Sequence, residues 1–150
     1  MSQWAPHATV ACVVEVDGRY LMVEERDKLG GQLVFNQPAG HLEAGESLVD
    51  AALRETLEET GWEVELVGLL GLSLYHAHTR DTTYYRTTFI AKALGQVENA
   101  TLDPDIHAVH WLDYEEILVL SDRMRSPVTL AVIERYREGI CYPLDLIHSS

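Results

Sequence analysis

Cysteine, long apolar runs and targeting signals are scarce or missing in this sequence. Its two cysteines, Cys12 and Cys141, lie far apart and outside any CxxC pattern, which is typical of free thiols. No apolar run approaches the ~20 residues that a membrane-spanning helix needs. The first seven residues lack the basic and apolar regions of a secretory signal. These absences predict a cytoplasmic protein with no membrane partner.

Basic residues are also few, with 11 Lys and Arg against 24 Asp and Glu, for a formal charge of −13. A surface this acidic repels a phosphate backbone, so we expect no general binding to nucleic acid. The same field repels a small phosphate-bearing substrate. An enzyme of this composition that acts on phosphates therefore needs metal ions, or Arg and Lys residues placed locally.

The pattern of apolar residues predicts a single domain over residues 1–150 with mixed secondary structure. A β-hairpin is expected around Asp17-Gly18, and Gln37–Gly40 has the composition of a turn. A helix capped by Ser47 should run to about Thr60 and end at Gly61. Further elements are indicated by apolar spacing: strands at 63–76, 82–94 and 107–112, and a helix at 127–138. This order favours an α/β sandwich.

Three carboxylates share one side of the helix before Gly61. At about 100° per residue, Glu55, Glu58 and Glu59 lie on neighbouring positions. Roughly opposite lies a face expected to bury against a sheet, formed by Val49, Leu53, Leu57 and Thr60. A charge run of this kind is usually a solvated helix face. Here the like charges repel one another, and clustered carboxylate oxygens are the ligands that Mg²⁺ and Mn²⁺ prefer. The pattern therefore indicates a divalent metal site.

The segment from 40 to 62 matches a known family signature at every fixed position. The Nudix hydrolase signature is G-x5-E-x7-R-E-U-x-E-E-x-G-U, in which U is a bulky apolar residue. Its fixed positions and final U are filled here by Gly40, Glu46, Arg54, Glu55, Glu58, Glu59, Gly61 and Trp62. Thr56 stands at the first U, where the family has Leu, Ile or Val. Because that is a packing position, the departure leaves the expected chemistry intact.

The chain thus resembles Nudix hydrolases, and the resemblance implies an α/β/α sandwich with a mixed sheet and a loop–helix–loop catalytic motif. It also implies a Mg²⁺ cofactor, for which Mn²⁺ would substitute, held by Glu55, Glu58, Glu59 and the Ala39 backbone carbonyl. Arg54 would orient a neighbouring glutamate, form an ordinary helix ion pair, or do both. Glu46 would support the loop and Arg54, while Gly40 and Gly61 shape the motif.

Two candidates for the general base follow from the resemblance, because Nudix enzymes differ in this respect. One is Glu55 and the other is Asp105, with Asp103 nearby. Asp103-Pro104-Asp105 is equally well explained as a simple turn.

Substrate contacts are expected outside the signature. Arg86 is placed to meet phosphate, and Tyr84 or Tyr85 to stack on a base unless they belong to the core. Gln37 and His41 flank the catalytic loop and are expected to contact the substrate as well.

Outside the signature, the chain is similar to the NudJ-type phosphatase branch of the family. The similar phrases are residues 7–14, 36–43, 125–127 and 142–144. This branch implies orthophosphate release from nucleoside tri- and diphosphates and from hydroxymethylpyrimidine diphosphate, by a monomer or homodimer. One alternative is a pyrophosphohydrolase of an oxidised nucleotide, a nucleotide sugar or a dinucleoside polyphosphate. A second is a non-catalytic module that senses a metabolite, which the intact signature argues against.

Overall fold

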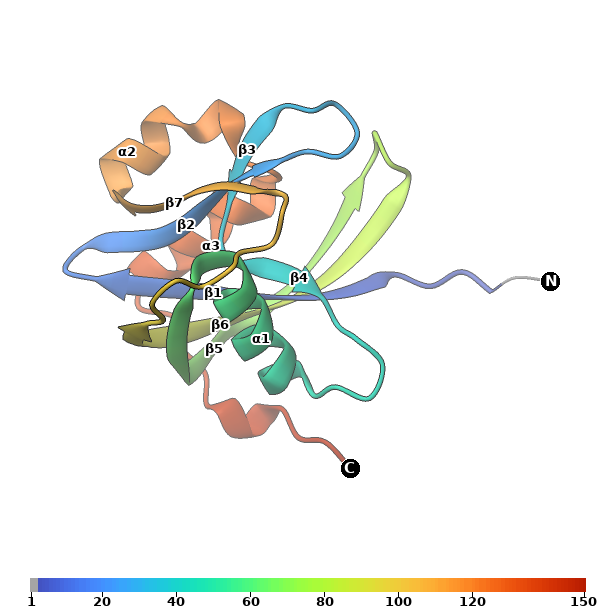
Figure 1. The fold of residues 1–150 in the computed structure, drawn as a ribbon. Coiled ribbons are helices and arrows are strands. Elements are labelled where there is room, and N and C mark those ends of the chain that lie inside the picture. Colours follow the sequence, from blue (N-terminus) through green and yellow to red (C-terminus); the bar gives the residue numbers. More distant parts are fainter. Residues whose placement is uncertain (1–2) are drawn as a thin grey trace.

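The computed structural model describes residues 3–150, in which helices pack on both faces of a mixed β-sheet (Figure 1). The strand order is β3-β2-β1-β6-β5, with β4 also paired to β1 and β7 to β2. β1 and β6 run parallel, and the other strand pairings are antiparallel. The strands are β1 (His7–Val16), β2 (Arg19–Arg26), β3 (Leu33–Asn36), β4 (Ala39–His41), β5 (Trp62–Ala77), β6 (Thr82–Gln96) and β7 (Ile106–Asp113).

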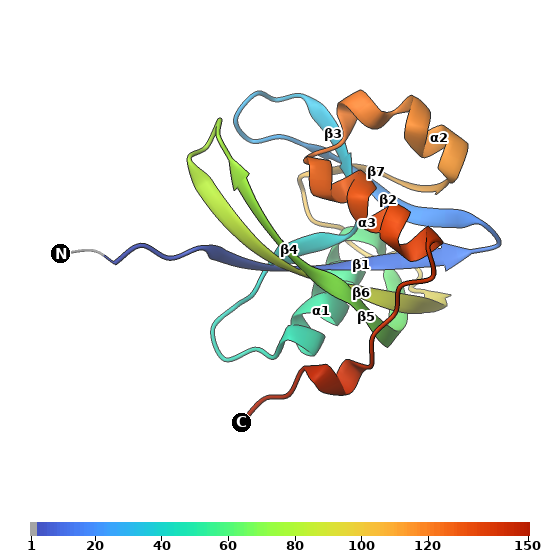
Figure 2. The ribbon, with the colours of Figure 1, turned by 180° about the vertical axis from the view of Figure 1, so that it is seen from behind.

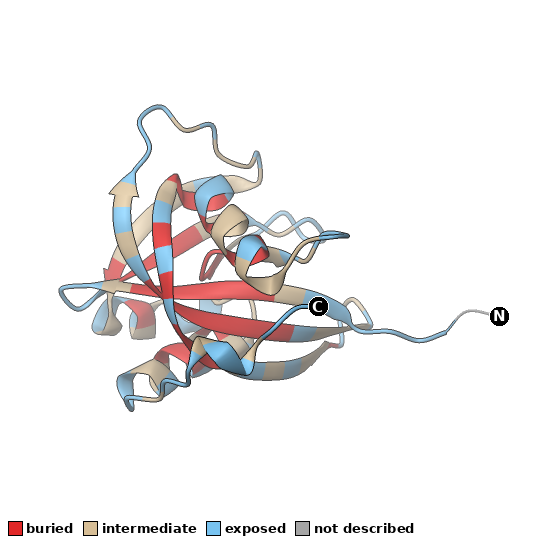
Figure 3. Cartoon of the chain, turned by 90° about the horizontal axis from the view of Figure 1, so that it is seen from below, coloured by how far each residue is buried: buried red, intermediate tan, exposed pale blue. Residues whose placement is uncertain are grey.

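The two faces of the sheet bury separate hydrophobic clusters. Val10, Cys12 and Val14 of β1 pack in the cluster that contains Ala51 and Ala52 of helix α1 (Leu48–Thr60). Alternate residues of a strand point to opposite faces. Accordingly, Val13 belongs to the second cluster, with residues of α2 (Tyr114–Val119) and α3 (Pro127–Arg137). Figures 2 and 3 show α3 on the far side of the sheet from α1 and the buried strands between them. The predicted α/β/α sandwich is confirmed.

The expected hairpin is present, but its two strands soon separate. β1 and β2 pair at Glu15↔Tyr20 and Val16↔Arg19, around a turn in which Asp17 and Gly18 have φ of 51° and 81°. Beyond these pairs, β1 bonds to β4 and β6, whereas β2 bonds to β3 and β7. The segment expected as a turn at 37–40 is partly strand, because Ala39 and Gly40 pair with β1.

Helix α1 begins and ends where its capping residues predict. The Ser47 hydroxyl accepts a hydrogen bond from the Asp50 N–H at 3.0 Å, and Gly61 adopts the left-handed conformation with φ of 76°. Its buried face was predicted correctly only in part. Thr60 is buried, and Val49 and Leu53 pack against the core, but Leu57 is 38% exposed. The other buried side chains of the helix are Ala51, Ala52, Thr56 and Glu59.

Thr56 is a packing residue, as the signature predicts. It is fully buried, and its hydroxyl donates to the Ala52 carbonyl at 2.8 Å, which satisfies the polar group inside the core. The face that carries Thr56 also carries Glu59, so this glutamate is turned inward with it. Within residues 3–150, every helix falls short of the length and hydropathy that a membrane-spanning helix requires.

Candidate active site

Arg54 links the loop before α1 to the carboxylates on the helix. Its Nε and Nη2 donate to the two oxygens of Glu46 at 2.6 and 2.9 Å. Its Nη1 donates to Glu55 at 2.8 Å and to Glu58, one turn on, at 3.2 Å. The bidentate guanidinium lowers the pKa of Glu46 to about 2. Arg54 therefore both holds Glu55 and forms the ordinary helix ion pair, and Glu46 supports Arg54 and the loop.

Gly40 allows the strand β4 to lie directly against Glu55. A Cβ at position 40 would stand 2.1 Å from Glu55 Cδ and 2.3 Å from both of its oxygens. Since no side chain fits this approach, the signature requires glycine here. Glu55 is thus positioned by Arg54 on one side and by the β4 backbone on the other, while burial raises its pKa.

Glu59 lies deeper than its two companions and beside a second buried acid. Its carboxylate accepts a hydrogen bond from the Ala39 N–H at 2.9 Å. Burial, and then the nearby Glu25 carboxylate, raise the pKa of Glu59 to about 9. Glu25 is 7% exposed and pairs with Arg125, whose Nε lies 2.7 Å from Glu25 Oε1. Charging Glu59 in this position is therefore unfavourable unless a further cation lies beside it.

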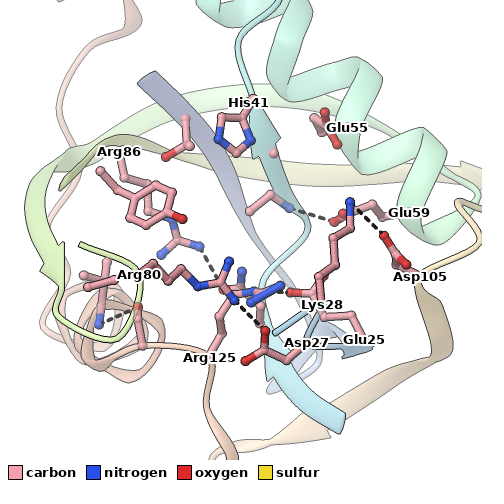
Figure 4. A pocket seen from close by; sticks show the side chains of 18 of the residues that line it. Glu25, Asp27, Lys28, His41, Glu55, Glu59, Arg80, Arg86, Asp105 and Arg125 are labelled. Atoms are coloured by element: carbon pink, nitrogen blue, oxygen red, sulfur yellow. Dashed lines mark hydrogen bonds and ion pairs between the residues drawn. The ribbon is translucent and has the colours of Figure 1, made fainter. Parts of the chain in front are cut away.

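A cavity of about 430 Å³ connects these groups (Figure 4). Figure 4 shows Glu59 and Asp105 on one side of it and Arg80 and Arg86 on the other. Although the chain has only 11 basic residues, five of them line this cavity, namely Arg26, Lys28, Arg80, Arg86 and Arg125. The local cations that the acidic composition called for are therefore gathered at one place.

Asp105 and Asp103 line the cavity together with Glu55 and Glu59. Asp105 Oδ2 lies 3.3 Å from Lys28 Nζ, and its N–H donates to Asp103 Oδ1 at 3.0 Å. The Asp103 N–H donates to the Glu58 carbonyl at 2.9 Å, which ties this segment to α1. The two interpretations of the segment are compatible, because it is a turn that places acids in the cavity.

Arg86 also lines the cavity and is 7% exposed. Its Nη2 donates to Asn36 Oδ1 at 3.0 Å and to Gln37 Oε1 at 2.9 Å. Within residues 3–150, its Nη1 has no hydrogen-bond partner. Burial lowers the pKa of Arg86 to about 10. A guanidinium beside the cavity that keeps a buried donor without a partner is suited to an anion that reaches it.

Gln37 was predicted to contact the substrate, but it does not line the cavity. It is fully buried, and its Nε2 donates to the Thr129 carbonyl at 2.7 Å. Because its Oε1 accepts from Arg86, it positions that side chain.

The open choice between Tyr84 and Tyr85 is decided by strand alternation. Tyr84 lines the cavity on the same face of β6 as Arg86, whereas Tyr85 points to the other face and is 42% exposed. Tyr85 is therefore the wrong member of the pair for a cavity contact. His41 does line the cavity, and burial followed by the charge of His7 lowers its pKa.

Seven charged residues of the cavity were missed, namely Glu25, Arg26, Asp27, Lys28, Glu43, Arg80 and Arg125. Glu25 follows the apolar run of β2, at a register shift between Glu24 and Glu25. A charged residue at the end of a buried strand can be recognised in a sequence as a candidate site residue. The β-bulge that turns the Glu25 side chain inward, however, has no local sequence pattern. Arg125 lies 100 positions away, so no spacing in the sequence links it to Glu25.

The donor groups fit a divalent hard cation. Glu55 and Glu59 are carboxylates whose pKa burial raises, so a bound cation would offset the cost of charging them. Within residues 3–150, no three acidic, His or Cys side chains converge on one point. Arg54 holds Glu55 and Glu58, and the Ala39 N–H holds Glu59, so cation binding requires these side chains to turn. Ala39 contacts Glu59 through its N–H, whereas the prediction concerned its carbonyl.

Comparison with known proteins shows the class to which this fold and cavity belong. The model of the NUDIX domain family matches residues 5–132. The chain is therefore a member of the Nudix hydrolase family, and the functional assignment made from its signature is confirmed at that level.

More specific relatives place the chain within the family. It is 40% identical to phosphatase NudJ of Escherichia coli K12 over 142 residues, covering 95% of this chain and 90% of that protein. The structure superposes on a NUDIX hydrolase from Nitrosomonas europaea with a TM-score of 0.94 and 38% identity, covering 97% and 98% of the two chains. The chain is a NudJ-like Nudix phosphatase.

A more distant structure shares the fold alone. It is a bifunctional NMN adenylyltransferase/ADP ribose pyrophosphatase from Francisella tularensis, complexed with AMP and a Mn ion. It is 20% identical with a TM-score of 0.62, covering 91% of this chain and 42% of that one.

Proposed function

We propose that this phosphatase cleaves the terminal phosphoanhydride bond of nucleoside tri- and diphosphates and of hydroxymethylpyrimidine diphosphate, releasing orthophosphate. The reaction requires Mg²⁺ or Mn²⁺ and takes place in the cytoplasm. The observation that carries the proposal is a single cavity with acidic groups on one side and the buried Arg86 on the other. A metal-bound phosphate chain needs both kinds of group.

Glu55, Glu58 and Glu59 would hold the metal, with the Ala39 carbonyl as a further ligand. When bound, the metal supplies charge neutralisation for the phosphates and activates water. The chain itself contributes position. Arg54 and the β4 backbone fix Glu55, and burial excludes water from around Glu59.

Arg86 would bind the phosphate that is transferred. Its Nη2 is fixed by Asn36 and Gln37, and its Nη1 is a buried donor without a partner, so a phosphate that reached Nη1 would meet a group already held in place. Arg125 lines the same cavity, but Glu25 already pairs with it. Arg86 is therefore the stronger candidate for a direct phosphate contact.

Glu55 is the better supported of the two candidate bases. Its raised pKa makes it a stronger proton acceptor than an ordinary carboxylate, and two neighbours hold it in place. Both candidates have a cationic partner, Arg54 for Glu55 and Lys28 for Asp105, so the preference for Glu55 rests on its raised pKa and its fixed position.

Phosphorus NMR of ATP, GTP and CTP digests, run without added pyrophosphatase, tests the proposal. Terminal attack gives nucleoside diphosphate and orthophosphate first, then monophosphate and a second orthophosphate. A chelator should stop the reaction, and Mg²⁺ should restore it. Pyrophosphate as the main early product would contradict terminal attack and favour the alternative pyrophosphohydrolase, leaving the family assignment intact.

A further inference from the structure

Part of the cavity wall is built from aromatic side chains on neighbouring strands. Tyr75 of β5 lies opposite Tyr84 of β6, which in turn lies opposite His7 of β1. His41 of β4 extends this set, since β4 pairs with β1 at Thr9↔His41. Cross-strand partners project from the same face of a sheet, so these rings form an aromatic row. Three of its members, Tyr75, Tyr84 and His41, line the cavity directly.

Three rings of the row, those of His7, His41 and Tyr84, contact one another. Ring centroids are 5.7 Å apart for His7 and Tyr84, 5.2 Å for His7 and His41, and 6.2 Å for His41 and Tyr84, all edge-on. A hydrogen bond of 3.1 Å joins His7 Nδ1 to His41 Nε2. Tyr75 and Tyr84 are half-buried, and the two histidines are exposed. The row is therefore ordered by its own contacts and still accessible to a ligand.

The aromatic row stands beside the phosphate-binding group proposed above. Arg86 follows Tyr84 by two positions on β6 and faces the same side, a spacing of roughly 7 Å along a strand. Apart from the row, the labelled side chains of the cavity wall in Figure 4 are charged. One small molecule with a planar end and an anionic end can contact both parts.

We propose that Tyr75, Tyr84, His7 and His41 form a subsite for the nitrogen heteroaromatic ring of the substrate, whose phosphates then extend toward Arg86. The inference rests on the proposed function for the phosphate part of the ligand. The histidine pair leaves a second nitrogen on each imidazole, which suits the donors and acceptors on the edge of such a ring. Stacking tolerates many bases because every base has a π-face, so the subsite selects for a ring rather than for one base.

Steady-state hydrolysis of CTP and of inorganic tripolyphosphate, which has no ring, tests the subsite. Tyr84→Ala should raise KM for CTP about tenfold, as expected for one lost stacking contact. The KM for tripolyphosphate should stay within about twofold. Tyr85→Ala is the matched control, with the same residue type on the same strand but on the face away from the cavity, and should change neither value. An equal rise for both substrates, or equal effects of the two variants, would overturn the proposal.

A binding measurement keeps the subsite testable without turnover. Saturation-transfer NMR should show contact between the protein and the ring protons of cytidine, lost in Tyr84→Ala and kept in Tyr85→Ala. His7→Ala, at the start of β1, serves as the second variant if Tyr84→Ala does not fold. If the wild type hydrolyses neither substrate, the proposed function fails, whereas the NMR result still decides the subsite. No transfer to cytidine in the wild type would refute it.

Discussion

The active site has an outer part around Arg54 and an inner part around Glu59, and the two parts balance the charge of their carboxylates in different ways. In the outer part, Arg54 makes short hydrogen bonds to Glu46 and also contacts Glu55 and Glu58. In the inner part, Glu59 and Glu25 are both buried, with Arg125 as the cation paired to Glu25. The difference indicates that the outer part supports structure from within the chain, and it agrees with the proposal that a cation from outside completes the inner part.

The largest effect should follow loss of charge in the inner part. Glu59→Gln keeps the size of the side chain but removes the charge, so we expect kcat to fall by roughly 10²-fold or more. Glu58→Gln should have a similar effect. The control is Asp50→Asn, an exposed acid at the start of the same helix, which should leave kcat unchanged. A Glu59→Gln enzyme with normal kcat would show that the inner carboxylate is structural.

Gly40→Ala should come next, because it breaks the contact through which the loop positions Glu55. The new Cβ would stand 2.1 Å from Glu55 Cδ, so the glutamate must move away from its present site. We expect kcat to fall at least tenfold, with little change in the free energy of unfolding, because the clash is with the flexible end of one side chain. Gly95→Ala is the matched control, since its Cβ would meet nothing within 4 Å. Equal kcat for the two variants would contradict this role of Gly40.

The two parts should also respond to pH with opposite signs. The pKa of Glu46 is lowered to about 2, so its contribution to stability is present above pH ~4.5 and is lost as pH falls toward 2. The pKa of Glu59 is raised to about 9, so its contribution is present below pH ~4.5 and is lost as pH rises toward 9.

In chelator, the Tm deficit of Glu46→Gln relative to wild type should therefore shrink on acidification. The Tm advantage of Glu59→Gln should grow between pH 5 and 9. Thermal unfolding of Glu46→Gln between pH 2 and 5, and of Glu59→Gln between pH 5 and 9, checks the signs, and curves parallel to the wild type would contradict the comparison.

The sequence predicts the outer part well and the inner part poorly, for physical reasons. The helix limits follow from Ser47 and Gly61, because caps act over three or four residues. The burial of Glu59 does not follow, since apolar periodicity placed Leu57 on the inner face that Thr56 and Glu59 occupy. Because the buried packing position 56 holds a polar threonine, the apolar pattern of the sequence did not mark the buried face of α1.

Contacts between distant segments account for the other errors. Which of Tyr84 and Tyr85 faces the cavity depends on strand register, and a shift of one residue exchanges the two faces. Glu25 pairs with Arg125, which lies far from it in the chain, so the pairing depends on the tertiary fold and not on local sequence. The assignment of residues 1–150 to a single domain stays a prediction.

The most direct test is a calorimetric titration of metal-free protein with Mg²⁺ at pH 7, in two buffers that differ in their heat of ionisation. Because the pKa of Glu59 is about 9, this carboxyl is largely protonated before the metal binds. The account predicts binding that releases about one proton in the wild type, and weak binding without proton release in Glu59→Gln. Equal affinity and equal proton release in the two proteins would contradict the claim that the inner carboxylates are completed by a cation.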